Sequence, residues 1–453
     1  MKKLWVFLLA LCLISAVNAQ VKHRGVYTSK TVHGRTLAKE IPIEPPAHTV
    51  YAKATYGLVG DGVTDDWNKF RLMAAAFCAD PVNTKLVFEV GTYRLNQTRS
   101  VYPGNSIQWS HCNGKTVAFA SSAVKIDNKG DFYRVDVTTE PIVPFVFIDS
   151  SNWTFNGDLT GLGRGEIDGN ADQMTQAYGQ SEGFDPGITT TRCSNYVIKN
   201  LKVHHFASDS ICIGANSEIS DVNGTVTNCE LYASGRLCLT VLCIDGFLSA
   251  YNLFYDGGRV GGSYGYHLPA GGVDVEPERK PPVQDRWTRN IVFDHDTFNG
   301  SLKMEFSNAW AHRVQDVTLR YATFNLDSAD DGDFIMINGS QVAITEYSTF
   351  NFASCTPGQF LTTSYSPSLP WPYITQEIYR YNTINSVCNN LWAAPPTAGL
   401  PLHFTSNKVN DGAQADNVSI TGWSSITNNQ FGLPSNRVTL GATTVSGNTY
   451  NVP

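Results

Sequence analysis

The chain has 453 residues and a formal net charge of −7, and 16% of its residues are charged. Apolar residues make up 42% of the sequence, which is too many for a disordered chain. A mildly acidic chain without clusters of Lys and Arg is a poor match for a phosphate backbone, so we expect no nucleic-acid partner.

The first 19 residues have the pattern of a secretory signal peptide. Lys2 and Lys3 form its positive end, an apolar run extends to Ile14, and a small-residue cleavage site ends at Ala19. The apolar run is too short for a membrane span, and no second such run follows. We therefore expect cleavage near Ala19, a secreted or periplasmic protein, and no membrane partner. Loss of Lys2 and Lys3 changes the net charge from −7 to −9.

Residues 20–100 are assigned to an N-terminal segment that contains one helix, in the stretch TDDWNKFRLMAAAFCAD at residues 64–80. Thr64 or Asp65 can cap this helix. Its apolar residues recur on one side, namely Trp67, Phe70, Met73, Ala74 and Phe77. The pattern predicts an amphipathic helix that covers a hydrophobic surface.

From residue 195 onward, many segments share one form, an alternating apolar run, a polar step often containing Asn, and a closing apolar residue. Examples are NYVIKNLKV, GTVTNCEL, RNIVFDHDTF and QDVTLRYATF. The closing residues recur at short intervals, for example 26 residues from Phe298 to Phe324 and 26 more to Phe350. Such a period with several short strands per repeat is typical of a parallel β-helix, in which the turns of the chain stack into a solenoid.

One interval between closing residues is longer, at 44 residues from Phe254 to Phe298. We interpret it as two turns of 22 residues with the segment GGVDVEPE in the middle. Residues 101–453 are accordingly assigned to the β-helix, with loop insertions. The helix at residues 64–80 is then the lid that the open end of a solenoid requires.

Three segments resemble the pectate-lyase-like right-handed β-helix superfamily. YGLVGDGVTDD (56–66) resembles its entry motif, GLGRGEIDGN (161–170) is similar to a turn of polygalacturonase-like glycoside hydrolases, and GGVDVEPE is similar to a rung of exported carbohydrate-active proteins. With the repeats, the resemblance covers roughly residues 50–453. It implies an all-β fold, a single-stranded right-handed parallel β-helix with an N-terminal capping helix, and a carbohydrate substrate.

The chain departs from the polygalacturonase pattern of N-T-D followed, one turn later, by G-D-D-C. The corresponding stretches here are SDSICIG and SGRLCLT. Asp209 matches the first motif, whereas Arg236 and Leu237 replace the paired carboxylates of the second. The polygalacturonase catalytic set is therefore incomplete, and a hydrolase would need carboxylates from elsewhere in the chain.

Two amphipathic segments supply such carboxylates, GGVDVEPE at residues 271–278 and SLKMEFS at residues 301–307. Successive side chains of a strand point to opposite faces. Asp274 and Glu276 should therefore share one face, and Lys303 and Glu305 should do the same in the second segment. If the two strands are neighbours, the four charged groups share one solvent face above a buried apolar layer.

Glycoside hydrolysis needs two carboxyl groups, a proton donor and a base or nucleophile. We assign Glu276 as the donor and Asp274 as the base or nucleophile, with Glu305 and Lys303 tuning or positioning them. Crowded carboxylates raise at least one pKa, and a nearby lysine holds another group ionised. Substrate contacts are expected from Arg236, Tyr266, His267, Asp209 and Trp310.

The same face allows two other functions. In a lyase for a uronic acid polymer, Lys303 would be the base and the carboxylates would bind Ca²⁺, and an epimerase would use the same scaffold. A non-catalytic glycan-binding solenoid is the third possibility, because solenoid faces form extended binding surfaces. For the hydrolase we expect no cofactor and no metal. All three functions imply a polysaccharide partner, and the oligomeric state stays open.

Ten cysteines are present, and nine remain after loss of Cys12 with the signal peptide. An odd number leaves at least one thiol free or paired between chains. A disulfide is possible between Cys78 and Cys112 or between Cys355 and Cys388, and the sequence alone does not determine the pairing. Four other cysteines lie in strand-like segments and are expected to be buried in the core: Cys212, Cys229, Cys238 and Cys243. The adjacent His204 and His205 are interpreted as a corner of the solenoid rather than a site.

Overall fold

The computed structural model forms two units, Met1–Ala47 and His48–Pro453. In the first unit, strand β1 (Thr31–Val32) pairs antiparallel with β2 (Arg35–Thr36). The structure describes residues 31–32, 35–36, 48–96, 106–128, 143–173, 186–215, 219–258, 271–276, 287–300, 304–307, 313–326, 335–338, 342–352, 361–363, 376–385, 390–393, 402–410 and 418–450.

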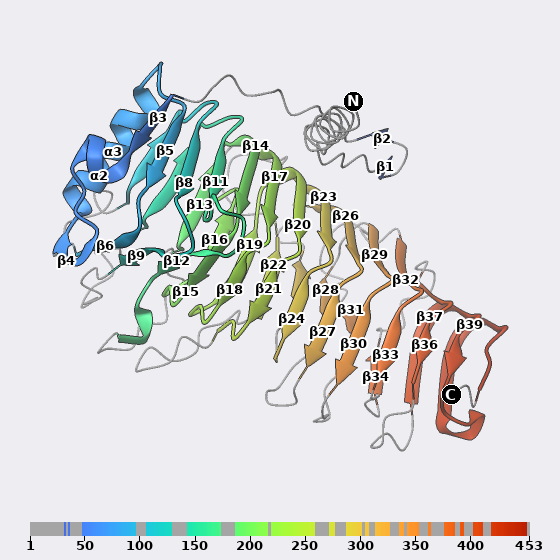
Figure 1. Ribbon diagram of the computed structural model, residues 1–453. Helices are drawn as coiled ribbons and strands as arrows, with labels where there is room; N and C mark the ends of the chain where they lie inside the picture. Colours follow the sequence, from blue (N-terminus) through green and yellow to red (C-terminus); the bar gives the residue numbers. More distant parts are fainter. Residues whose placement is uncertain are drawn as a thin grey trace, which may run out of the picture. The chain divides into compact units, whose positions relative to one another are not determined.

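The second unit is a right-handed parallel β-helix, in which each turn of the chain adds a strand to three columns of parallel strands (Figure 1). Column 1 contains β7 (Gln108–Ser110), β10 (Phe145–Ile148), β13 (Ile188–Thr191), β16 (Ile211–Ile213), β19 (Leu237–Val241), β22 (Gly271–Val275), β25 (Met304–Ser307), β28 (Ile335–Asn338), β31 (Leu361–Thr363), β34 (Asn390–Ala393) and the first half of β37 (Val418–Thr427).

Columns 2 and 3 follow column 1 in each turn. Column 2 contains β3 (Thr49–Tyr51), β5 (Lys85–Phe88), β8 (Thr116–Phe119), β11 (Thr154–Asn156), β14 (Ser194–Lys199), β17 (Asp221–Thr227), β20 (Ile244–Ala250), β23 (Trp287–Asp294), β26 (Arg313–Arg320), β29 (Val342–Glu346), β32 (Gln376–Arg380), β35 (Leu402–Thr405), the second half of β37 and the second half of β39 (Val438–Ser446). The first half of β39 continues column 1. Column 3 contains β4 (Asp61–Asp65), β6 (Gly91–Leu95), β9 (Val124–Asn128), β12 (Gly165–Asp168), β15 (Leu201–His204), β18 (Glu230–Tyr232), β21 (Leu253–Tyr255), β24 (Thr297–Asn299), β27 (Thr323–Leu326), β30 (Thr349–Phe352), β33 (Thr383–Asn385), β36 (Lys408–Val409) and β38 (Gln430–Phe431).

In the part of the chain that the structure describes, the helices are α2 (Ala52–Tyr56) and α3 (Trp67–Ala79), together with the 3₁₀ turns η1 (Ala171–Gln173) and η2 (Ser435–Arg437). Helix α3 lies at the N-terminal end of the strand columns (Figure 1), and all five residues of its predicted apolar side are buried. The ring of Phe70 packs against Phe88, Trp109 and Phe145 of the first turns. The expectation that Thr64 or Asp65 caps the helix is wrong, because the N-cap residue is Asp66. Asp65 lies one residue earlier, and its Oδ1 accepts a hydrogen bond from the Trp67 N–H at 3.0 Å.

No helix among the described residues is long and apolar enough to cross a membrane.

The closing residues of the sequence repeats pair with one another in column 3, which confirms the solenoid. Their register runs from Val203 through Leu231, Phe254, Phe298, Phe324, Phe350, Ile384 and Val409 to Phe431. The division of the long interval into two turns is wrong, because Phe298 pairs directly with Phe254. Strand β22 belongs to that single turn, which is lengthened by the connections before and after it.

From β14 onward, a single residue in the left-handed region makes the corner between columns 2 and 3. Over five successive turns this residue has an exposed ring, and the rings of Tyr251, His295, Tyr321, Tyr347 and Tyr381 stack at centroid distances of 4.9–5.2 Å. The following residue points inward. Asn382 is typical, because its Oδ1 accepts the Ser348 N–H at 2.9 Å and its Nδ2 donates to the Thr345 carbonyl at 2.9 Å. Side chains thus satisfy the buried backbone groups at this corner.

The cysteines follow the sequence expectations where they are described. Cys78 of α3 and Cys112 form a disulfide. Cys355 and Cys388 lie outside the described residues. The four cysteines expected in the core are buried without a disulfide, and Cys193 is a fifth.

Candidate functional site

The two predicted carboxylate strands lie side by side in column 1. Strand β22 pairs with β25, and the register places Asp274 beside Glu305. On the other side of β22, Asp274 is beside Thr240 of β19. Val273 and Val275 point into the core and are fully buried, so Asp274 lies on the outer face, as the alternation predicts.

The expectation that these charges share an open solvent face is wrong for Asp274. This side chain is only 2% exposed. Strands flank it on both sides, and it lies close enough to Arg236 for its negative charge to act on the guanidinium. The outer face of column 1 therefore holds a buried acid at this point.

Arg236 and Asp209, both predicted as substrate contacts, bind each other. The Nε and Nη2 groups of Arg236 donate to the two carboxylate oxygens of Asp209 at 3.0 and 3.2 Å. The hydroxyl of Thr240 donates to Asp209 Oδ2 at 2.7 Å. Burial works against the charge of Arg236, but Asp209 and, more weakly, Asp274 outweigh it and raise the pKa of Arg236. The result is a buried network of one cation and two acids.

Glu276 follows directly after β22 and is partly exposed. Its backbone N–H donates to the Val241 carbonyl at 3.0 Å, which continues the strand pairing by one step. Glu276 therefore stands two residues beyond Asp274 at the end of β22, where the chain leaves column 1.

Four predicted site residues lie outside the described residues, namely Lys303, Tyr266, His267 and Trp310. For Glu305 the structure gives the backbone position only. The structure thus brings five of the nine predicted residues onto four neighbouring strands, β16, β19, β22 and β25, or the segments next to them. They are Asp209, Arg236, Asp274, Glu276 and Glu305.

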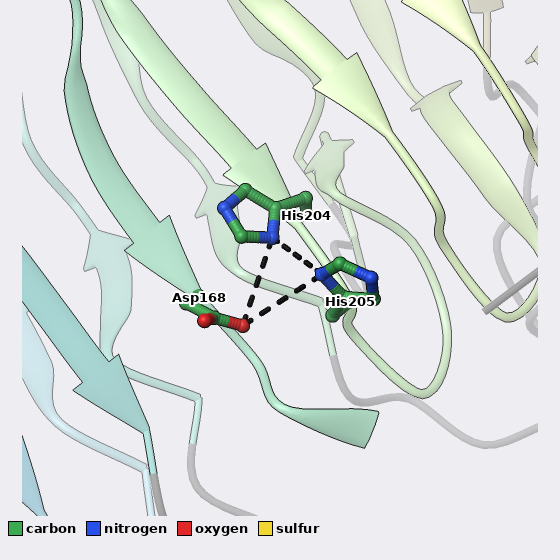
Figure 2. Close-up of side chains that lie close together, drawn as sticks. All are labelled: Asp168, His204 and His205. Atoms are coloured by element: carbon green, nitrogen blue, oxygen red, sulfur yellow. Dashed lines mark hydrogen bonds and ion pairs between the residues drawn. The ribbon is translucent and has the colours of Figure 1, made fainter. Parts of the chain in front are cut away.

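A second cluster lies in column 3 and contains Asp168, His204 and His205 (Figure 2). Register pairing places Asp168, the last residue of β12, beside His204, the last residue of β15. The Nδ1 atoms of the two histidines are 2.6 Å apart, and Asp168 Oδ1 lies 3.6 Å from the first and 3.9 Å from the second. Among the described residues this is the set of side chains that could hold a metal ion.

Two more charged groups surround this cluster. Lys125 Nζ lies 2.7 Å from Asp168 Oδ2 and 2.8 Å from Glu166 Oε1. Burial alone would lower the pKa of Lys125, but these hydrogen bonds outweigh burial and raise it. His204 and Lys125 together lower the pKa of Glu166 to about 2, so Glu166 is ionised at neutral pH. Burial and the neighbouring His204 lower the pKa of His205.

Aromatic rings hold His204 in place. The ring of Tyr232 stacks on the His204 imidazole at 4.5 Å, and Tyr255 stacks on Tyr232 at 4.5 Å. From the sequence, His204 and His205 were predicted to form a corner of the solenoid, and Asp168 was assigned no role. The signal was the solenoid period, because one turn of the chain separates Asp168 from His204.

No family model matches the sequence, and no curated protein matches it. Solved structures match its fold. The A-module of the Azotobacter vinelandii mannuronan C-5 epimerase AlgE6 is 12% identical over 89% of this chain and 99% of the module, with a TM-score of 0.52. PfbA, a surface adhesin of Streptococcus pneumoniae, is 11% identical over 89% of this chain and 90% of that chain, with a TM-score of 0.51.

A third similar structure is the tailspike protein of E. coli bacteriophage HK620, a double mutant in complex with a pentasaccharide. It is 10% identical over 89% of this chain and 78% of that chain, with a TM-score of 0.50. At identities this low, the structural similarity shows a shared fold and nothing more. The chain therefore shares the parallel β-helix fold of these three structures.

Proposed function

Starting from this β-helix architecture, we propose that the chain is an exported enzyme that hydrolyses a polysaccharide, with carboxylates on the outer face of column 1 as its catalytic groups. Two of the three similar structures support a carbohydrate substrate, since one is named as a mannuronan epimerase and another holds a pentasaccharide. The residues of column 1 support the reaction.

The observation that carries the proposal is the burial of Asp274 beside the Arg236–Asp209 pair. Removing charges from water is costly, and a buried acid–arginine network seldom stabilises a fold as much as apolar packing would. Perturbed charges of this kind cluster at functional sites. A catalytic role therefore explains why column 1 keeps these charges, whereas two turns away on either side the register position of Asp274 is occupied by Cys212 and Met336.

Asp274 acts as the base or nucleophile in this proposal. The positive charge of Arg236 favours the ionised form of a nearby carboxylate. Arg236 is itself fixed by two hydrogen bonds to Asp209, so its position does not depend on substrate. An ionised carboxylate held in one place is the group that retaining enzymes use as nucleophile and inverting enzymes use as base.

Glu276 acts as the proton donor. It lies two residues from Asp274, a Cα separation of about 6.7 Å along a strand, so the two carboxyl groups can flank one glycosidic bond. Glu276 is partly exposed at the end of β22, so a bound glycan can reach its carboxyl group. Glu305 lies beside Asp274 in register, and its role in tuning or positioning the two catalytic groups stays a prediction.

The test is to incubate the purified full chain with a panel of neutral and uronic acid polysaccharides, with and without a chelator. Hydrolysis releases reducing ends without ultraviolet-absorbing products, and it persists with chelator. Ultraviolet-absorbing products that need calcium would replace the proposal with a lyase. Binding to a glycan without any product would replace it with a binding function. Glu276→Gln should lose this activity. Glu346→Gln is its control and should keep the activity, since Glu346 pairs with Arg380 on column 2.

A further inference from the structure

We propose that Asp168, His204 and His205 form a binding site for a divalent transition-metal ion of the zinc type. The site lies in column 3, on strands other than those that carry the proposed hydrolytic residues. Its existence is therefore independent of the function proposed for column 1.

The three candidate ligand atoms converge on one point (Figure 2). They are Nδ1 of His204, Nδ1 of His205 and Oδ1 of Asp168, with separations of 2.6, 3.6 and 3.9 Å. Zinc binds nitrogen at 2.0–2.1 Å and carboxylate oxygen at about 2.0–2.2 Å, so two ligands of one tetrahedral ion are about 3.3–3.5 Å apart. The carboxylate separations are near this value, and the two histidines need to part by less than about 1 Å.

The surroundings of His204 favour a lone pair on the atom that faces the cluster. Glu166 Oε1 lies 3.5 Å from His204 Nε2, on the far side of the ring. A carboxylate at this position favours the proton on Nε2, which leaves Nδ1 unprotonated, and metal-binding histidines commonly have such a partner. Tyr232 stacks on the same ring and fixes its plane. The ring is therefore oriented as a ligand would be.

Asp168 is also oriented by its neighbours. Lys125 holds Oδ2 at 2.7 Å, and the Asn170 N–H donates to Oδ1 at 2.9 Å. This arrangement turns Oδ1 toward the two histidines. The carboxylate is therefore positioned before any ion arrives, which lowers the cost of binding.

The charge balance at the cluster suits a dication. Asp168 and Glu166 contribute two negative charges and Lys125 one positive charge, so the group is net negative when both histidines are neutral. Two imidazole nitrogens and one carboxylate oxygen match zinc and related metals, whereas calcium prefers oxygen ligands alone. The His205 side chain is 27% exposed, which gives an ion and a water ligand a path to the site.

A simpler arrangement is a hydrogen bond between the two Nδ1 atoms with no ion. It needs one histidine to donate and the other to accept, and it gives no affinity for metals. Metal titration separates these two arrangements, because only the first predicts saturable binding that depends on all three side chains.

The experiment uses tag-free full chain stripped with a chelator and then titrated with Co²⁺, whose visible absorption reports coordination. We expect one ion per chain, displacement by Zn²⁺, and no displacement by Ca²⁺. His205→Asn and Asp168→Asn should each weaken Co²⁺ binding by at least tenfold. Asparagine suits position 205 because His205 has a left-handed backbone with φ 53°.

The matched control is His295→Asn. His295 also has a left-handed backbone, with φ 62°, and its Nδ1 lies 2.6 Å from Asp294 Oδ1, but it has no second histidine beside it among the described residues. This variant should bind Co²⁺ like the wild type. Absence of Co²⁺ binding in the wild type would overturn the proposal. Equal binding by wild type and by folded His205→Asn and Asp168→Asn proteins, with folding checked by circular dichroism, would also overturn it.

Discussion

Arg236 donates two parallel hydrogen bonds to Asp209 on the outer face of column 1, from Nε to Oδ1 at 3.0 Å and from Nη2 to Oδ2 at 3.2 Å. Both side chains are buried, so removing one leaves an uncompensated charge inside the protein. We expect Arg236→Met to lower the free energy of unfolding by about 3–5 kcal/mol. Urea denaturation monitored by circular dichroism measures this loss.

The double variant Arg236→Met, Asp209→Asn should recover part of the loss, because the second change removes the stranded charge. Arg289→Met is the control, since Arg289 and Asp245 form a more exposed pair at 2.6 Å, and it should cost less than about 1 kcal/mol. Equal losses for Arg236→Met and Arg289→Met would show that burial adds nothing to the first pair.

Glu276 and Asp274 are predicted to differ in how their loss depends on the leaving group. General acid–base groups typically contribute 10²–10⁴-fold to rate. Glu276→Gln should lose about this factor on a polysaccharide, but much less on an aryl glycoside whose leaving group needs no proton. Asp274→Asn should lose activity on both substrates. The kcat/KM values for the two substrates decide the roles, and the reverse pattern would exchange them.

The repeats made the register of column 3 predictable. Phe298, Phe324 and Phe350 are evenly spaced because their turns have loops of similar length, and their rings stack at 4.6 and 4.8 Å. The interval from Phe254 to Phe298 was wrongly predicted to contain two turns, because a long connection adds residues without adding a turn. Sequence period therefore predicts which residues stack, but it does not count turns where loops are long.

The face of Asp274 was predictable, whereas its burial was not. Alternation along β22 fixes the direction of a side chain, but the groups that cover it come from other turns. Arg236 lies 38 residues before Asp274 in the sequence and acts on it through the stacking of β19 and β22. The same holds for Asp168 and His204, which only the register of β12 and β15 brings together.

The Cys78–Cys112 disulfide is expected to hold the capping helix onto the first turns. It closes a loop with a sequence separation of 34 residues, for which chain entropy predicts a stabilisation of about 4 kcal/mol. Cys78→Ser, Cys112→Ser should therefore speed hydrogen exchange of the α3 amides and lower the melting temperature. The buried thiols provide the control, because Cys229 and Cys238 should stay unreactive toward a thiol reagent in both proteins until unfolding. Unchanged α3 exchange would contradict the prediction.

Asp296 is expected to make the β-helix less stable as the pH rises from 3.8 to about 7. It occupies an inward corner position where other turns have Asn382, Asn407 and Asn429, and its Oδ1 accepts the Asn252 N–H at 2.7 Å. Burial raises the pKa of Asp296 to about 7, from 3.8. Between these two pH values the folded state holds a proton that the unfolded state has lost, so stability falls as pH rises.

Asp296→Asn should remove this dependence. The asparagines of other turns donate Nδ2 to a carbonyl of the preceding turn, as Asn382 does to Thr345 and Asn407 to Tyr379. A neutral amide at position 296 can form the equivalent bond, whereas an ionised carboxylate there carries no proton to donate. We expect the variant to gain roughly 2–4 kcal/mol over the wild type at pH 8 and to match it near pH 4. Urea midpoints at both pH values measure the difference, and an equal gain at pH 4 would show that ionisation of Asp296 is not its cause.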